Sequence, residues 1–128
     1  MLLATVLLSA CSKPEPPQLS QGTLLPSARP VTDFRLTDHR GQPFTLENLE
    51  NHWTFAFFGY THCPDVCPTS MAMLAQVQRN LKQQDGLHQM PQVVFVSVDP
   101  ERDTTELLSQ FVPYFHPDFI GASGDQQN

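Results

Sequence analysis

Two short apolar runs mark the middle of the chain and predict β-strands. Residues 53–58 read WTFAFF and end at Gly59, and residues 93–98 read VVFVSV and end at an Asp-Pro pair. Aromatic and β-branched side chains fill both runs, and such side chains favour strands. Because the first run is almost continuously apolar rather than alternating, we expect it to be a central strand that is buried on both faces.

Between and after these runs, apolar residues recur at helical spacing. They predict a helix over residues 69–84, with Gln78 among the polar positions on its other faces. A second, shorter helix is expected to start near Asp103, with Glu106 three residues later as its capping-box partner. The apolar stripe expected on the first helix consists of Met71, Leu74, Val77 and Leu81.

The remaining elements complete an α/β pattern. Apolar residues at 34–36 and 44–46 flank Gly41, which predicts a hairpin with the glycine at its turn. Residues 119–121 are expected to begin a further strand. The order is therefore hairpin, strand, helix, strand, helix, strand. Strand–helix–strand units of this length predict parallel strands joined by right-handed crossovers.

The N-terminus carries a different kind of apolar run. Residues 2–10 are almost entirely apolar, but they are too few to cross a bilayer core of about 30 Å. LSAC at residues 8–11 resembles the lipobox of bacterial lipoproteins, which implies a signal peptide over residues 1–11 and lipidation of Cys11. The alternative is a buried N-terminal helix with an incidental cysteine. The expected location is the cell envelope, with the protein anchored to the membrane and facing the periplasm.

Composition sets the rest of the domain plan. Residues 12–30 hold five of the twelve prolines and are expected to form an extended tether. Residues 31–128 then form one small domain, since 40% of the chain is hydrophobic and nine phenylalanines can fill a core. The net charge is −6 and the basic residues are scattered singly, so we expect no nucleic-acid partner.

The candidate chemistry lies in a pair of cysteines. Cys63 and Cys67 lie between the strand predicted at residues 53–58 and the helix predicted at residues 69–84. Open α/β sheets concentrate their functional groups at such positions. Pro68 is suited to the first helical position, so we expect Cys67 at the helix N-terminus, with its thiol pKa lowered by unpaired amides and the helix dipole.

The spacing of the pair leaves three hypotheses open. Positions i and i+4 bring two β-carbons within about 5–6 Å, close enough for both sulfurs to meet one ion, and two soft thiolates favour Cu(I). A redox-active pair that works without metal is the second hypothesis. An inert structural disulfide is the third, although so small a loop restricts little unfolded-state entropy. A structural zinc site is disfavoured, because it would want four ligands.

The residues around the pair resemble the Sco/SenC family of copper proteins. The resemblance rests on FFGYTHCPDVCP at residues 57–68 and VSVDPERDT at residues 96–104. FRLTD at residues 34–38 fits the opening hairpin of the family, and FIG at residues 119–121 fits a later segment. The match extends from about Val31 to Gly124.

The resemblance implies a thioredoxin-like fold and a copper ion bound by Cys63 and Cys67. It implies a metallochaperone whose partner is the copper subunit of cytochrome c oxidase, with its apo copper-A site. The third family ligand is a histidine well downstream of Cys67, in a segment that this sequence lacks, so we expect an incomplete domain with its C-terminal part missing. An envelope thiol–disulfide oxidoreductase that reduces partner cysteines is the alternative function, which leaves enzymatic activity open.

Overall fold

The computed structural model describes residues 19–84, 86 and 88–124, and the chain divides into two units after Pro30. In the first unit, residues 19–30 are exposed and contain neither helix nor strand. The expected signal segment and Cys11 lie outside the described residues. The tether and the domain boundaries therefore stay predictions.

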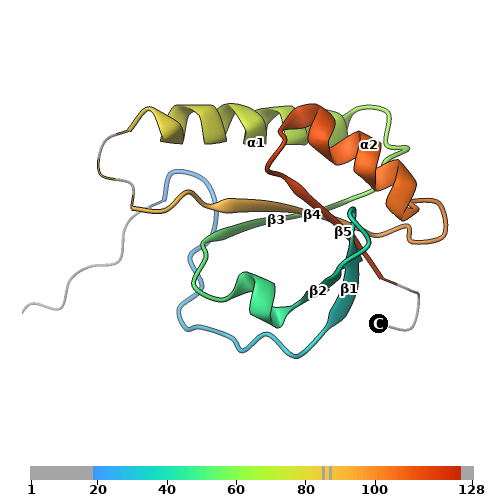
Figure 1. The fold of residues 1–128 in the computed structure, drawn as a ribbon. Helices are drawn as coiled ribbons and strands as arrows, with labels where there is room; N and C mark the ends of the chain where they lie inside the picture. The colour runs from blue at the N-terminus through green and yellow to red at the C-terminus, as the bar shows by residue number, and fades with distance from the viewer. Residues whose placement is uncertain (1–18, 85, 87, 125–128) are drawn as a thin grey trace, which may run out of the picture. The chain divides into compact units, whose positions relative to one another are not determined.

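The second unit is built on one five-stranded sheet (Figure 1). The strands are β1 (Arg35–Asp38), β2 (Pro43–Thr45), β3 (Thr54–Gly59), β4 (Gln92–Ser97) and β5 (Ile120–Ser123). Their order across the sheet is β2-β1-β5-β4-β3. The last three strands are parallel to one another, whereas β1 is antiparallel to both β2 and β5. The predicted element order and the parallel β3–β4–β5 arrangement are confirmed.

The predicted hairpin is also confirmed, and its turn shows why it forms. Gly41 has a φ of 78°, which glycine adopts without the penalty that a side chain would impose. The Asp38 carboxylate accepts hydrogen bonds from the amides of Arg40 and Gln42, at 2.9 and 2.8 Å. These local bonds stabilise the turn, and the amide of His39 adds a bond to the carbonyl of Gly121 in β5, at 2.7 Å. A short 3₁₀ helix, η1 (Leu46–Leu49), follows and was not expected from the sequence.

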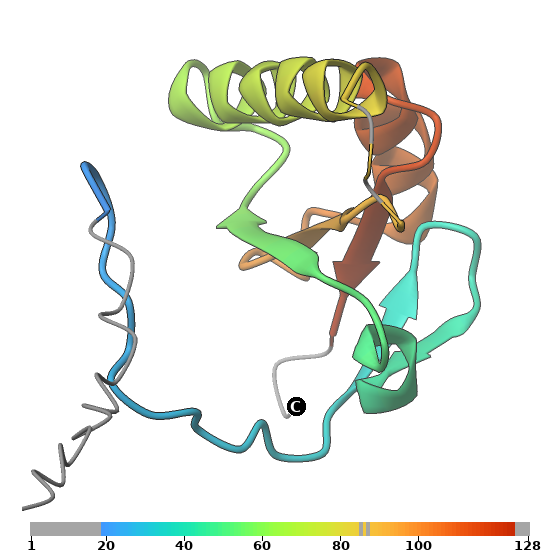
Figure 2. The same cartoon turned by 90° about the vertical axis from the view of Figure 1, so that its left-hand side faces the viewer.

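Two helices cover one face of the sheet, as Figures 1 and 2 show from two directions. They are α1 (Val66–Lys82) and α2 (Thr105–Phe115). The core beneath them joins side chains from both helices, from β4 and from the residue just before β5: Met71, Ala75, Val93, Phe95, Leu108, Val112 and Phe119. A smaller cluster on the opposite face contains Phe44, Val94 and Ala122.

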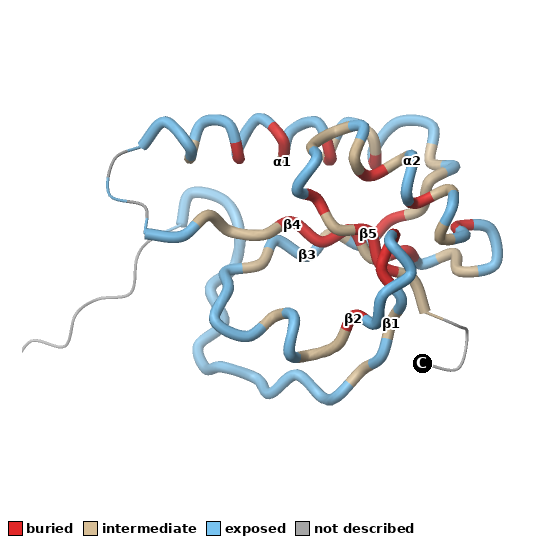
Figure 3. The backbone as a smooth tube through the Cα atoms, in the orientation of Figure 1, coloured by how far each residue is buried: buried red, intermediate tan, exposed pale blue. Residues whose placement is uncertain are grey.

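The expectation that β3 is a central strand, buried on both faces, is wrong for the described residues. Here β3 pairs with β4 alone and occupies an edge of the sheet. Phe55 is 40% exposed and Phe58 is 66% exposed. Figure 3 shows the contrast between β3 and the buried interior strand β4. An apolar run of six residues predicts a β-strand, but it does not predict whether that strand has one neighbouring strand in the sheet or two.

The buried face of α1 also differs from the expected stripe. Met71 is fully buried, but Val77 is 39% exposed. Ala75 and Gln78 are buried in its place, and the amide of the Gln78 side chain donates a hydrogen bond to the carbonyl of Pro91. A glutamine with a backbone acceptor in reach can therefore enter a position that a hydropathy pattern assigns to the surface.

Candidate functional site

The two cysteines lie at the carboxyl end of β3, where the chain turns into α1. Cys63 belongs to the loop between Gly59 and Val66 and is half-buried, whereas Cys67 is only 4% exposed. Both are free thiols in the structure. The amide of Cys67 donates a hydrogen bond to Cys63 Sγ at 3.4 Å. The structure therefore brings together the two residues that the sequence singled out.

The helix begins three residues before the predicted range of 69–84 and ends two residues before the end of that range. Its first residue is Val66, so Pro68 occupies the third helical position rather than the first. Proline is tolerated there because the first amides of a helix have no acceptor within the helix. As a result, Cys67 lies inside the first turn, and the unpaired amides of this turn are directed at the sulfur of Cys63.

This placement reverses the expected acidities of the two thiols. Hydrogen bonds from the amides of Asp65 and Cys67 lower the pKa of Cys63 to about 7. Burial is the main cause that raises the pKa of Cys67, and the neighbouring Cys63 adds to it. The prediction that Cys67 is the activated thiol is therefore wrong. Near neutral pH Cys63 is therefore partly ionised, whereas Cys67 stays protonated.

Close packing fixes the position of Cys67. A Cβ atom added at Gly59 would lie 3.0 Å from Cys67 Sγ, and equally close to the rings of Phe57 and Phe95. The glycine before the loop is therefore required by space rather than by an unusual backbone angle. Tyr60 follows it, and its backbone amide forms a hydrogen bond with Cys67.

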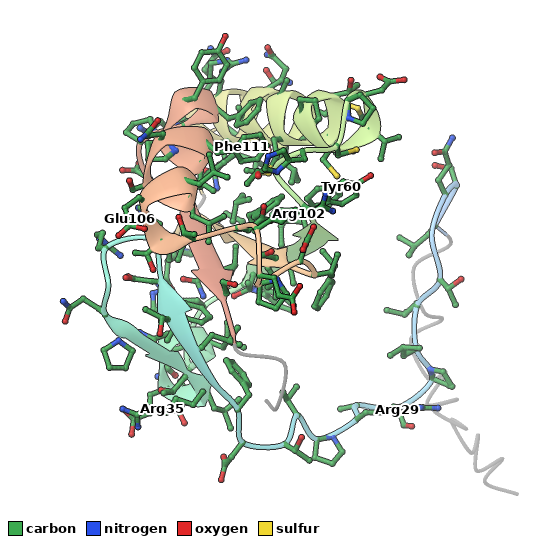
Figure 4. All side chains as sticks on the ribbon, turned by 90° about the vertical axis from the view of Figure 1, so that its right-hand side faces the viewer. Arg29, Arg35, Tyr60, Arg102, Glu106 and Phe111 are labelled. Atoms are coloured by element: carbon green, nitrogen blue, oxygen red, sulfur yellow. The ribbon has the colours of Figure 1, made fainter. Side chains whose placement is uncertain are left out.

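Tyr60 also contacts the other cysteine. Its side chain forms a hydrogen bond with Cys63, and the charge of Cys63 raises the pKa of the Tyr60 hydroxyl. Arg102, which comes from the loop after β4, lies near Tyr60 (Figure 4). Its guanidinium is paired with the Asp99 carboxylate. The loop before α2 thus forms one wall of the site.

Asp103 in that wall was missed as a site residue. The sequence suggested that it starts α2, but Thr104 is the N-cap, and the Thr104 hydroxyl accepts a hydrogen bond from the amide of Leu107. The Asp103 carboxylate turns inward instead and accepts hydrogen bonds from Thr61 and Ser97. One signal was available: Ser97 ends β4 and Thr61 follows the neighbouring parallel strand β3, and the carboxyl ends of such strands meet at the same edge of a sheet.

The histidines of the chain do not complete a metal site with the cysteines. In the described part of the chain, no group of three or more His, Cys, Asp or Glu side chains is arranged to hold a metal ion. His62 is exposed, with Nδ1 3.1 Å from the hydroxyl of Thr61. His39 is buried elsewhere, where its Nδ1 accepts a hydrogen bond from the amide of Gly121. The other histidines are His52, His88 and His116.

The site offers a metal a pair of adjacent sulfurs, and the pKa of one of them, Cys63, is lowered to about 7. Thiolates are soft ligands, so the donor set suits Cu(I) better than hard cations such as magnesium or calcium. No helix in the described ranges is long and apolar enough to span a bilayer.

Comparison with known proteins finds relatives that match most of the chain. The SCO1/SenC family profile matches residues 23–128. The chain is 44% identical over 92 residues to the protein SCO2 homolog, mitochondrial, of Homo sapiens, a match that covers 72% of this chain and 34% of that protein. The chain thus spans about a third of the length of this curated relative.

Solved structures give the same result for the fold. The crystal structure of Arabidopsis thaliana ScoI with copper bound matches with a TM-score of 0.70 and 40% identity, over 75% of this chain and 58% of that chain. BsSco, described as a member of the Sco family of cytochrome c oxidase assembly proteins with a disulfide switch, matches with a TM-score of 0.62 and 26% identity, over 76% and 56% of the two chains. The predicted α/β, thioredoxin-like fold is confirmed. Taken with the profile match over residues 23–128, these likenesses show that the chain belongs to the SCO1/SenC family.

Proposed function

We propose that this protein binds copper through Cys63 and Cys67 and delivers it during the assembly of the copper-A centre of cytochrome c oxidase. The observation that carries the proposal is the adjacent pair of free thiols, in which Cys63 accepts a hydrogen bond from the amide of Cys67. Copper-bound ScoI, which shares this fold and 40% of the matched sequence, supports the choice of metal.

The uneven acidity of the two thiols suits a protein that takes up and releases an ion. A metal ligand must be deprotonated, so binding to the pair releases protons. Because the pKa of Cys63 is lowered to about 7, a substantial fraction of it is already ionised at neutral pH, and it can make the first contact with Cu(I). Cys67, which is more buried, then loses its proton as the ion reaches the second sulfur. The resemblance to the Sco/SenC family implies that a histidine downstream of Cys67 supplies the third copper ligand.

The partner and the location follow from the same proposal. The receiver is the copper-bearing subunit of cytochrome c oxidase, in line with the description of BsSco as a cytochrome c oxidase assembly protein. Lipidation at Cys11 would place the domain at the membrane, facing the periplasm. Residues 12–30, with five prolines, would hold it away from the lipid surface.

A competition assay tests copper binding. The intact protein, reduced and free of oxygen, is titrated with Cu(I) in the presence of bicinchoninate, a chelator that competes for the metal. We expect one Cu(I) per chain in the wild type and in Cys11→Ser, and none held by Cys63→Ser or Cys67→Ser. Cys11→Ser is the matched control because it removes a thiol outside the pair. Failure of the wild type to hold Cu(I) against bicinchoninate would contradict the proposal.

A second candidate function is metal-free reduction of a partner disulfide. It is favoured by the half-exposed Cys63, whose lowered pKa makes it the attacking thiolate in place of Cys67. Its attack breaks the partner disulfide and forms a mixed disulfide, and one partner sulfur leaves as a thiolate. Cys67 then loses its proton, attacks the sulfur of Cys63, and releases the partner as a dithiol, leaving a Cys63–Cys67 disulfide.

The two cysteine variants separate this function from copper delivery. Cys67→Ser should accumulate the mixed disulfide with a model partner, detected as an added mass, because the resolving thiol is absent. Cys63→Ser should form none. Equal trapping by both variants would mean that the thiols are not differentiated as the structure indicates, and no trapping by either would leave copper handling as the function of the pair.

A further inference from the structure

Asp103 is a buried carboxylate beside the dithiol. It is 1% exposed and lies in the loop between β4 and α2. Its Oδ2 accepts hydrogen bonds from the Thr61 amide at 3.1 Å and from the Ser97 hydroxyl at 2.6 Å. Its Oδ1 accepts a hydrogen bond from the Thr61 hydroxyl at 2.6 Å. A carboxylate survives burial only when its oxygens are satisfied in this way.

The partners of Asp103 show what the carboxylate fixes. Thr61 lies two residues before Cys63, in the loop that carries this thiol, and three of the four hydrogen bonds to the carboxylate come from it, because its amide also contacts Oδ1 at 3.3 Å. Ser97 is the last residue of β4. Asp103 therefore ties the cysteine loop, which follows an edge strand, to the end of the buried strand beside it.

Other roles for Asp103 are already filled by its neighbours. Thr104 caps α2. Arg102 is paired with Asp99 rather than with the buried carboxylate. The imidazole of His62, which is exposed, lies farther off, with its Nδ1 3.9 Å from Oδ1. The strongest contacts of Asp103 are thus directed at the backbone and side chain of Thr61.

We propose that Asp103 is a positioning residue for the dithiol, and that through Thr61 it holds the Cys63 loop in the conformation that presents both sulfurs to one copper ion. The inference rests on the proposed copper-binding function and adds the residue that prepares the site for the metal. Residues that orient metal ligands without binding the metal themselves typically contribute a factor of about ten to a hundred in metal affinity.

The test uses substitutions at Thr61, because removing the buried carboxylate can prevent folding. Thr61→Val deletes the hydroxyl that donates to Asp103 while keeping the size and branching of the side chain. Thr61→Ser restores the hydroxyl. Thr104→Ala is the matched control. It removes the hydroxyl of the residue after Asp103, which caps α2 and makes no hydrogen bond to the cysteine loop. Asp103→Asn, which preserves the shape of the side chain, is a second variant should Thr61→Val fail to fold.

The readout is the dissociation constant for Cu(I), measured on the intact protein by competition with bicinchoninate. We expect Thr61→Val to raise it about tenfold, and Thr61→Ser and Thr104→Ala to stay within about threefold of the wild type. A Thr61→Val protein that melts at a lower temperature but binds Cu(I) like the wild type would overturn the inference, because Asp103 would then be only structural.

A second readout separates this inference from the proposed function. Oxidised glutathione converts the dithiol to the disulfide and yields two molecules of reduced glutathione, and the equilibrium ratio is measured by mass. A loosened loop no longer holds Cys63 against the Cys67 amide, so Thr61→Val should shift the equilibrium toward the disulfide more than threefold, and Thr61→Ser should not. If the wild type binds no Cu(I), the proposed function fails, and this equilibrium alone decides for or against the role of Asp103.

Discussion

Replacing Gly59 with alanine tests the close packing behind the dithiol. The added methyl group would lie 3.0 Å from Cys67 Sγ, from one ring carbon of Phe57 and from one ring carbon of Phe95. Carbon and sulfur atoms normally keep well beyond this distance. Phe95 is fully buried and cannot retreat, so the strain must be relieved by Phe57 or by Cys67.

The size of the effect follows from two opposing contributions. Inserting a methyl group into a filled core costs typically about 1–3 kcal/mol. Alanine also restricts the unfolded chain more than glycine does, which returns about 0.4–1 kcal/mol. We therefore expect a net loss of about 1–2 kcal/mol in the free energy of unfolding. For a domain of this size, that loss lowers the melting temperature by roughly 4–16 °C.

The assay combines thermal unfolding with alkylation of Cys67 under native conditions, read by peptide mass. The Gly59→Ala protein should be less stable, and its Cys67 should react faster because the sulfur is displaced from its buried position. Gly41→Ala is the control: nothing lies within 4 Å of the new Cβ there, so only the φ of 78° is penalised and Cys67 should react as in the wild type. A Gly59→Ala protein with wild-type stability and wild-type Cys67 reactivity would refute the packing argument.

Three other measurements address separate parts of the structure. The rate of alkylation of Cys63 should rise with pH around a midpoint of about 7, and a midpoint near the usual thiol pKa of about 8.5 would contradict the hydrogen-bonded thiolate. Burial and the charge of Arg40 lower the pKa of His39, so stability should fall as the pH drops below about 6.5, because the unfolded chain takes up a proton that native His39 refuses; His39→Gln should weaken this dependence in urea unfolding at pH 7.5 and 5.5. Leu108→Ala, in a side chain with no exposed surface, should cost about 2–5 kcal/mol in the same urea assay, and a cost below 1 kcal/mol would mean that the core refills the space.

The sequence was a good guide wherever the local pattern determines the outcome. The hairpin around Gly41 formed as expected because its turn is satisfied by Asp38, three residues away. The two strands that carry continuous apolar runs also formed, because β-branched and aromatic side chains favour an extended backbone wherever they are placed in a sheet.

The wrong predictions concern properties that depend on segments distant in the sequence. Whether β3 is central or peripheral depends on which strands pair with it, and its own six residues carry no such information. The acidity of Cys67 depends on burial against Gly59, Phe95 and the rest of the interior. Sequence reasoning placed this thiol at the helix N-terminus and did not foresee its burial, so the predicted direction of its pKa was wrong.

The two cysteines of the site were predicted from the sequence, but the carboxylate that contacts their loop was not. Cys63 and Cys67 were singled out by their spacing, and the structure brings them together. Asp103 reaches the same loop from 42 residues away in the chain, through Thr61. No periodicity marks such a contact. It becomes visible only when two neighbouring parallel strands are known to end side by side.

The pairing of β1 with β5 has a consequence for how the domain is made. Thr37 pairs with Ser123, and the Asp38 position pairs with Ala122, so the first strand of the domain is locked by the last one described. Pairings this distant in sequence close slowly, because the entropy of a long loop is lost before the contact stabilises it. The hairpin can form early from local contacts, yet its apolar side chains Leu36 and Phe44 wait for the arrival of β5. A nascent or refolding chain therefore exposes apolar surface until β5 pairs with β1. At this stage the chain is prone to aggregate, and a chaperone that binds unfolded chains would protect it.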